Sequence, residues 1–555
     1  MRHSYCMRNY ILVYIFLLFI SASCGNELAQ QKNRQIFNLN LSSGSLESLD
    51  PAYAKDLYTM WTTHMLYNTL VETDSNLYLQ PSLAKSWDIS ADGLTYIFHL
   101  QSNVYFHDNP LFNGKRKMTA TDVAHSFSRI INPEVASSGA WIFNGHVKDS
   151  GSFEARDDST FVLHLSAPFR PMLAMLSMPY CSIVPKEVVD YYGKDFRSHP
   201  CGTGPFQFKS WDEGNVLLLH KSPVYWEKDK EQRALPYLDA IQITFYDSKA
   251  TEFLLFRQGK LHFTHSLDGS FKDLILRKDG QLKKDYSDKF KLKKGRYLNT
   301  EYLGFLTDTS SPLLLHSSLK NKLVRQAINY AIDRKKIITY FKNGIGIPAT
   351  GGFTPPGIAG FDTVAAYGYD YNPAKAAQLL AKAGYPGGKG LEPITILTPE
   401  NFADIVNFIA TQLQEAGIPA KIEIMQPNIL KQQMSRSQAV FFRAQWIADY
   451  PDAETYLAFF NSSFPAPPNY TRYNNPNFDE LYRKSMNLPD SMRYRVYRQM
   501  DSMAISDAPL VPLFYDQLLH FTQNEVQGFS SNPMNLIELK RVTLKQKGKS
   551  INEQN

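Results

Sequence analysis

The chain has 555 residues, of which 43% are hydrophobic and 13% aromatic, and its formal net charge at neutral pH is +6. This composition is typical of a well-packed globular protein and excludes a disordered or fibrous one. A small net charge spread over so large a surface gives no reason to expect nucleic acid as a partner. The length exceeds that of one simple core and predicts two or three compact units.

Residues 1–23 have the order of a secretory signal. Arg2 and Arg8 precede an apolar run over residues 10–20, which is too short to span a bilayer as a stable helix. Small residues at 21–23 then lead to Cys24. This order resembles a bacterial lipoprotein signal, in which the cysteine becomes the lipidated first residue of the mature chain. The alternative is an ordinary cleaved signal with a chance cysteine. We expect a periplasmic or otherwise extracytoplasmic protein, anchored to a cell membrane through a lipid on Cys24.

Cys181 and Cys201 are the other two cysteines after the signal, twenty residues apart. In an oxidising compartment a disulfide between them would persist, and the sequence predicts one. Two free thiols or half of a metal site are the alternatives, but neither cysteine has Cys-x-x-Cys spacing or a histidine at ligand spacing.

In the first part of the chain, the spacing of apolar residues predicts several strands and a helix. Phe37, Leu39 and Leu41 alternate with polar residues and predict a strand. Thr119 and Asp122 form a capping box for a helix with an apolar stripe. Further strands are expected at 95–100, 216–220 and 240–246.

In the part from about 300 to 450, predicted helices and strands alternate. Helices are expected over 320–334 and from Asn372-Pro373 to Gly384. A strand at 394–397, a helix over 402–416 and a strand at 420–425 form a βαβ unit, which implies a parallel sheet covered by helices. We expect two α/β lobes, with the chain crossing between them near 300 and again near 510.

Sequence motifs of catalysis are missing. The sequence has no Gly-x-Ser-x-Gly elbow, no Ser-x-x-Lys with its partner motifs and no His-Glu-x-x-His zinc helix. His262 and His265 form the closest histidine pair but have no acidic residue alongside, so no metal site is predicted. We expect no enzyme activity and no cofactor. An exported hydrolase stays an alternative, because the two acids of a glycosidase need share no local motif.

A series of short segments is informative as an ordered set. It comprises Ser48-Leu49-Asp50-Pro51-Ala52, residues 66–71, 80–87, 92–96, 104–108 and 119–123, Gly202-Thr203-Gly204-Pro205-Phe206, residues 223–226 and 324–328, and Trp446-Ile447-Ala448-Asp449-Tyr450-Pro451-Asp452. In this order, and over nearly the whole mature chain, the segments resemble the peptide and nickel class (family 5) of solute-binding proteins that serve ABC importers.

The resemblance implies an α/β fold: the two-lobed periplasmic-binding-protein or "flytrap" fold with an extra subdomain, a type II-like, cluster C architecture. On this basis residues 1–23 are the signal peptide and 546–555 a flexible tail. Lobe I is discontinuous, the extra subdomain is inserted in it, and lobe II is one segment. The expected ranges are 24–75, 200–298 and 508–545 for lobe I, 76–199 for the subdomain and 299–507 for lobe II.

The resemblance also implies the cargo: short peptides, captured by a monomer between the lobes and delivered to ABC permease subunits. A nickel or other metal-chelate receptor, or a haem receptor, is the alternative on the same fold. Asp449 matches the position that takes the peptide ammonium in dipeptide and oligopeptide binders, and Arg443 looks like the arginine that oligopeptide binders aim at a carboxylate.

Trp446, Gln445 and Ile447 belong to the same candidate binding segment. Gln445 stands where oligopeptide binders carry a small residue, and its bulk would narrow the cleft. Simpler interpretations exist for both charged residues. An Asp before Tyr-Pro can be a turn residue, and Arg443 can form an ion pair inside its lobe.

Overall fold

The structure is a computed structural model that describes residues 34–41, 46–148, 150–265, 269–361 and 363–545. The expected signal peptide, Cys24 and the tail from 546 lie outside these ranges. Within them, no helix is long and apolar enough to cross a membrane.

A four-stranded sheet lies near the start of the described chain. Its order is β1 (Ile36–Leu41), β10 (Ala240–Phe245), β9 (Val216–Lys221) and β8 (Phe206–Asp212). The predicted strand at Phe37 is β1, which runs parallel to β10, so segments two hundred residues apart lie side by side. Helix α2 (Leu57–Leu66) begins at Asp56, whose carboxylate accepts from the Tyr58 and Thr59 N–H groups.

A second sheet of four antiparallel strands continues the same part of the molecule. Its order is β4 (Ala84–Ile89), β5 (Thr95–Leu100), β7 (Thr160–His164) and β6 (Phe153–Asp157), with α3 (Ala120–Ile131), α4 (Met172–Met175) and α5 (Lys186–Tyr192) beside it. The capping box at Thr119 and Asp122 is confirmed at the start of α3. One continuous hydrophobic core joins both sheets. We call this whole part the first lobe.

A mixed sheet of seven strands forms the centre of the other half. Its order is β11 (Phe263–His265), β17 (Leu510–Gln523), β12 (Phe290–Phe305), β16 (Phe441–Ile447), β14 (Ile394–Thr398) and β15 (Ala420–Ile424), with β13 (Ile347–Pro348) paired to β17. The βαβ prediction is confirmed, because β14 and β15 are parallel neighbours joined through α12 (Ala403–Glu415). We call the sheet from β12 to β15, with helices α9 to α16, the second lobe.

Helices cover this sheet. They are α9 (Lys322–Ala331), α10 (Arg334–Phe341), α11 (Pro373–Lys382), α13 (Pro427–Ser435), α14 (Glu454–Leu457), α15 (Pro476–Ser485) and α16 (Asp490–Asp507). The single helix predicted over 320–334 is interrupted. Ile332 is extended, and the Asp333 carboxylate accepts from the Lys336 N–H, which caps α10 as a separate helix.

The remaining elements are short. Three are α-helices: α6 (Lys249–Arg257), α7 (Gly269–Ile275) and α8 (Lys284–Ser287). Short strands pair as β2 (Val71–Thr73) with β3 (Leu79–Pro81), β18 (Val526–Gln527) with β21 (Thr543–Leu544), and β19 (Ser530–Ser531) with β20 (Ile537–Glu538). The 3₁₀ helices are η2 (Pro51–Tyr53), η3 (Ala140–Ile142), η4 (Pro179–Cys181), η5 (Gly193–Ser198), η6 (Pro312–Leu314), η7 (Ser318–Lys320), η8 (Pro386–Gly388), η9 (Glu400–Phe402) and η10 (Ala458–Phe460).

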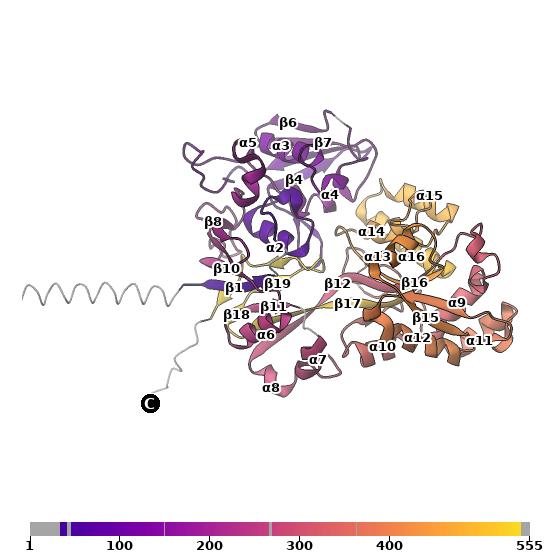
Figure 1. Ribbon diagram of the computed structural model, residues 1–555. Helices are drawn as coiled ribbons and strands as arrows, with labels where there is room; N and C mark the ends of the chain where they lie inside the picture. Colours follow the sequence, from indigo (N-terminus) through magenta and orange to yellow (C-terminus); the bar gives the residue numbers. More distant parts are fainter. Residues whose placement is uncertain (1–33, 42–45, 149, 266–268, 362, 546–555) are drawn as a thin grey trace, which may run out of the picture.

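Two long antiparallel strands, β12 and β17, connect the halves of the molecule (Figure 1). Their pairing is interrupted by a bulge: Arg296 pairs with Gln517 and Thr300 with Tyr515, which leaves residues 297–299 out of register. A second register shift lies between Glu301 and Tyr302, and because a bulge bends a strand and disrupts its ladder, the regular pairing of β12 with β17 is broken between residues 296 and 302.

The predicted disulfide is wrong. Cys181 and Cys201 are both free, buried thiols. Their sulfurs face different backbone carbonyls, those of Met175 and His107. Each thiol is a small apolar group packed in the core of the first lobe, and burial raises the pKa of both well above the ordinary value.

Candidate functional site

Asp449 is held by the end of β16 and the turn that follows it. The Ala448 N–H donates to the Leu298 carbonyl (2.9 Å), which fixes this turn to the bulge of β12. The Asp449 N–H donates to the Thr455 hydroxyl at the start of α14 (3.3 Å). The position is therefore set by three elements, the strand, the bulge and the helix.

A cavity of about 370 Å³ opens beside Asp449 and is bordered by both lobes. The first lobe contributes Trp141, His146, Phe169 and Met175, and the second contributes Trp446, Tyr450, Phe464 and Tyr482 among others. No lysine or arginine is among the residues that line it. Burial lowers the pKa of His146, so its ring is uncharged at neutral pH. The walls are thus mainly apolar, and the charge in the cavity is negative.

Asp449 can be reached from the cavity, yet protein surrounds much of its carboxylate. This loss of solvation raises its pKa, while a hydrogen bond from Thr455 partly opposes the shift. Within the part of the chain that the structure describes, no lysine or arginine pairs with this carboxylate. It is suited to bind a cation that enters the cavity.

Glu454 lies behind Asp449 and was not predicted as a site residue. Only 2% of it is exposed, and its carboxylate accepts hydrogen bonds from the Tyr450 and Tyr482 hydroxyls. Burial raises its pKa to about 7. The nearby Arg493 is already occupied by Asp452 (2.6 Å) and Asp490 (3.0 Å).

Arg443 points to a different partner. It lies on β16, is 8% exposed and pairs with Glu301 of β12, and its guanidinium stacks 3.2 Å from the centre of the Phe402 ring. Asn299 donates to both Glu301 (3.3 Å) and Asp516 (2.7 Å). The structure thus has the ion pair inside the lobe that the sequence left open as an alternative.

The other three predicted residues lie on alternate faces of β16. The Trp446 indole N–H donates to the Thr455 carbonyl (3.0 Å), and its ring lines the Asp449 cavity. Gln445 and Ile447 are exposed on the opposite face, where the Arg443 guanidinium donates to the side-chain Oε1 of Gln445 (3.3 Å). The five predicted residues therefore do not converge on one cavity.

A second cavity of about 370 Å³ is lined by Lys272 of α7, Tyr297 in the β12 bulge, Lys342 after α10 and Asp516 of β17. Lys342 pairs with Asp516 (3.0 Å). Lys272 has no ion-pair partner within the described ranges. Burial and the charge of Lys342 lower its pKa to about 8. This cavity can accept an anionic group.

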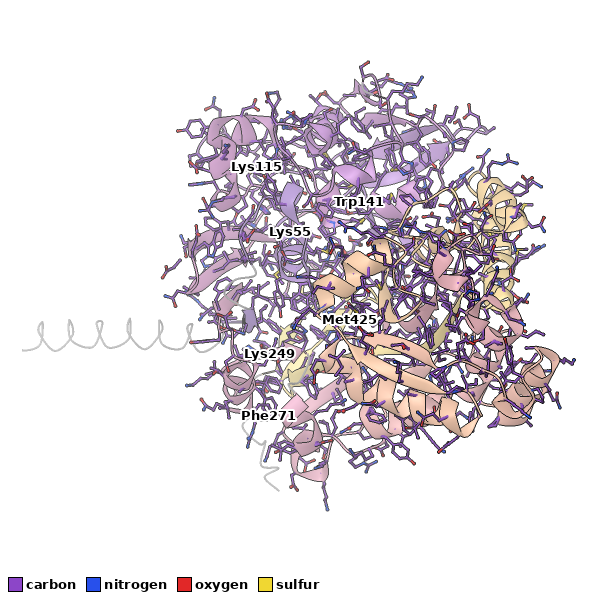
Figure 2. The ribbon with its side chains drawn as sticks, turned by 45° about the vertical axis from the view of Figure 1, so that its right-hand side comes forward. Lys55, Lys115, Trp141, Lys249, Phe271 and Met425 are labelled. Atoms are coloured by element: carbon purple, nitrogen blue, oxygen red, sulfur yellow. The ribbon has the colours of Figure 1, made fainter. Side chains whose placement is uncertain are left out.

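The two lobes touch at the mouth of the Asp449 cavity. The Trp141 and Tyr450 rings lie 6.0 Å apart, centre to centre, at 33°. The Arg170 N–H donates to the Met486 carbonyl (3.0 Å), which joins the loop before α4 to the end of α15. Figure 2 labels Trp141 on the side of the first lobe that faces the second. The cavity is thus bordered by parts that approach one another when the lobes close.

Known proteins are similar to this one along most of the chain. The sequence model for bacterial extracellular solute-binding proteins, family 5 (middle region), matches residues 78–467. The chain is 26% identical over 491 residues to the glutathione-binding protein GsiB of Salmonella typhi, covering 87% of this chain and 89% of that protein. It is 28% identical over 493 residues to heme-binding protein A of Haemophilus influenzae, covering 85% of each. The solved structure of the ABC transporter-associated periplasmic binding protein DppA from Helicobacter pylori, in complex with the peptide STSA, has a TM-score of 0.68 and 27% identity, covering 94% of this chain and 100% of that one.

Proposed function

Because the chain belongs to the bacterial extracellular solute-binding proteins of family 5, the non-catalytic binding components of ABC transporters, we propose that its cargo is a short peptide with a free amino terminus. The observation that carries this proposal is Asp449, a carboxylate without a cation in an apolar cavity between the lobes. A peptide ammonium supplies the missing charge, and lobe closure over it removes water from the pair.

The charge of the cavity favours a peptide over the other cargoes named for relatives. Haem carries two propionates, and the γ-glutamyl end of glutathione carries a carboxylate beside its amine. Both would bring negative charge to a cavity that holds Asp449 and is lined by no lysine or arginine. A peptide amino terminus brings only a positive charge.

The carboxyl end of the cargo has two candidate partners. Arg443 could receive it only by sharing its guanidinium with Glu301. The second cavity offers the ammonium groups of Lys272 and Lys342 instead. Its wall residue Tyr297 lies in the β12 bulge, and the next residue, Leu298, accepts a hydrogen bond from Ala448, so the bulge connects the second cavity to the turn that carries Asp449. We favour the lysines for a peptide long enough to pass the bulge.

The anchoring of the protein is part of this proposal. A lipid on Cys24 would hold the binding protein close to its permease and raise its effective concentration there. Cys24→Ser is expected to move the protein from the membrane fraction to the soluble extracytoplasmic fraction without unfolding it. A wild-type protein that is already found in the soluble fraction would contradict the lipid anchor.

Calorimetry of Asp449→Asn tests the cargo. The substitution keeps the shape and removes the charge, so affinity for a free-amine peptide should fall by about 2–5 kcal/mol, roughly thirtyfold to several thousandfold. N-acetylation of the peptide should cause the same loss in the wild type, and the two losses should not add, because both delete one interaction.

Asp404→Asn, an exposed carboxylate at the start of α12, is the matched control and should bind like the wild type. Native mass spectrometry of gently purified protein should reveal bound short peptides. Recovery of haem or a metal complex with no peptide, together with unchanged binding by Asp449→Asn, would reject the proposal.

A further inference from the structure

Aromatic side chains border the Asp449 carboxylate from both lobes. Trp141 and Phe169 lie on the first-lobe side, and Trp446 and Phe464 lie on the second-lobe side. The group bonded to the cargo's α-carbon next to its ammonium must therefore enter an apolar space. From this arrangement we infer that the protein selects peptides whose first residue has a large apolar side chain, aromatic above all. This inference rests on the proposed function, because it assigns the ammonium to Asp449.

Trp141 is presented rigidly toward the cavity. It lies in η3 and is 38% exposed, while its neighbours Ile142 and Phe143 are fully buried and anchor the turn in the core of the first lobe. Gly139 packs so closely on Tyr180 that a Cβ atom there would come within 2.5 Å of the tyrosine ring. An exposed tryptophan on a turn that packs this closely offers a large contact surface at little cost in conformational entropy.

Phe169 extends the same wall. Its ring stacks on His146 at 4.1 Å and 24°, and the imidazole is uncharged at neutral pH. Polar groups on this side are thus neutral, and they give an acidic first side chain no partner. An acidic side chain would also meet the negative charge of Asp449.

The opposite wall is fixed by contacts within the second lobe. Trp446 is oriented by its indole hydrogen bond to the Thr455 carbonyl (3.0 Å) and by the Phe459 ring 5.6 Å away. Tyr450 stacks on Trp141 and donates to buried Glu454, so its ring is held as well. A side chain between these walls is enclosed only when the lobes approach, which links its size to closure.

Calorimetry with four free-amine tripeptides tests the inference: Phe-Ala-Ala, Leu-Ala-Ala, Ala-Ala-Ala and Glu-Ala-Ala. Phe-Ala-Ala is expected to bind wild-type protein at least about tenfold more tightly than Ala-Ala-Ala, as burial and ring contact of one large side chain imply. Leu-Ala-Ala should lie between them, and Glu-Ala-Ala should bind most weakly.

Trp141→Ala should reduce the Phe-to-Ala ratio to about threefold or less and change the affinity for Ala-Ala-Ala by less than about threefold. Trp141→Phe keeps a ring and should keep most of the preference. Tyr191→Ala on α5, an exposed tyrosine (68%) that does not line the cavity, is the control and should retain the full ratio.

The two proposals fail in different ways. Equal affinity of the wild type for Phe-Ala-Ala and Ala-Ala-Ala, with Asp449→Asn weakening both, would overturn the inference and leave the proposed function standing. A preference that Trp141→Ala leaves unchanged would overturn the role of Trp141. No binding of any of the four peptides would overturn both the inference and the proposed function.

Discussion

Charged side chains gather in two regions of this molecule, around Lys540 in the first lobe and around Asp449 beside the cavity. Lys540 is 3% exposed, and its ammonium lies 2.7 Å from Glu227, 3.3 Å from Glu72 and 3.5 Å from Glu538. Arg541 also pairs with Glu227. Asp449 and Glu454 have hydrogen-bond donors nearby, but no lysine or arginine lines their cavity.

The two regions differ in the groups that neutralise their charges. The Lys540 cluster joins β2, the loop after β9 and the C-terminal segment, so its charges are compensated inside the chain and serve to hold distant segments together. No lysine or arginine pairs with Asp449 among the described residues, and the proposed cargo would supply the missing positive charge. Stability and binding are thus assigned to separate groups of charge.

Lys540→Met should have the largest effect on stability. It leaves three half-buried glutamates without their shared ammonium, and the free energy of unfolding is expected to fall by about 3–5 kcal/mol. Urea denaturation of the unliganded protein measures this change. Lys335→Met, which removes an exposed lysine of α10, should change the value by less than about 0.5 kcal/mol. A Lys540→Met protein as stable as the wild type would contradict the stabilising role of the Lys540 cluster.

Glu454→Gln should change the pH dependence of stability. Burial raises the pKa of Glu454 from 4.5 to about 7, so the folded protein binds the proton more tightly than the unfolded chain. Stability from this group is fully present below pH 4.5 and is lost as the pH rises to about 7.

Between pH 5 and 7.5 the wild type should therefore lose about 2–3 kcal/mol more than Glu454→Gln. The groups that face Glu454 are Tyr450, Tyr482, Asp449 and Arg493, and they are present in both proteins. Buried Asp501, whose pKa is raised to about 6, contributes equally to both and cancels in the difference. Parallel pH profiles would show that Glu454 is already ionised at pH 5 in the folded protein and would contradict the raised pKa.

Asp449→Asn should have the smallest effect on unliganded stability. The substitution removes a carboxylate that has lost solvation and has no positive partner, so the free energy of unfolding is expected to change by less than about 1 kcal/mol. The same urea titration serves here. A loss as large as that of Lys540→Met would mean that Asp449 has a structural partner and would remove the contrast between the two regions.

Local patterns predicted much of the fold. The capping box at Thr119, the Asn372 cap of α11 and the βαβ unit around α12 depend on neighbouring residues, and all three are confirmed. The α/β binding-protein architecture is confirmed as well. Asp333 shows the limit of the helical pattern, because its cap interrupts an apolar period that continues across it.

Contacts between segments that are far apart in the chain could not be predicted from the sequence. Arg443 meets Glu301 through pairing of β16 with β12, and no spacing along the chain indicates that register. Trp141 and Asp449 are brought together only by the approach of the lobes. The cysteine spacing permitted a disulfide, but packing in one core did not bring the sulfurs into a bond. Trp141 is exposed although Ile142 and Phe143 after it are buried. This contrast indicates a role for Trp141, and only the structure shows it.

The two ends of the described chain lie together in the first lobe, and this has a consequence for the order of folding. Gln35 and Leu544 exchange two hydrogen bonds (3.0 and 2.6 Å), and the Trp61 indole N–H donates to the Asn535 carbonyl (2.7 Å). The second lobe also needs residues beyond 507, because the Arg325 and Arg334 side chains donate to the carbonyls of Ala508 and Pro512. The first lobe has to wait for the last forty residues, because closing so long a loop comes before its contacts are gained. In a chain made from its amino terminus, the hydrogen bonds between these two ends therefore form only after residue 544 has been made.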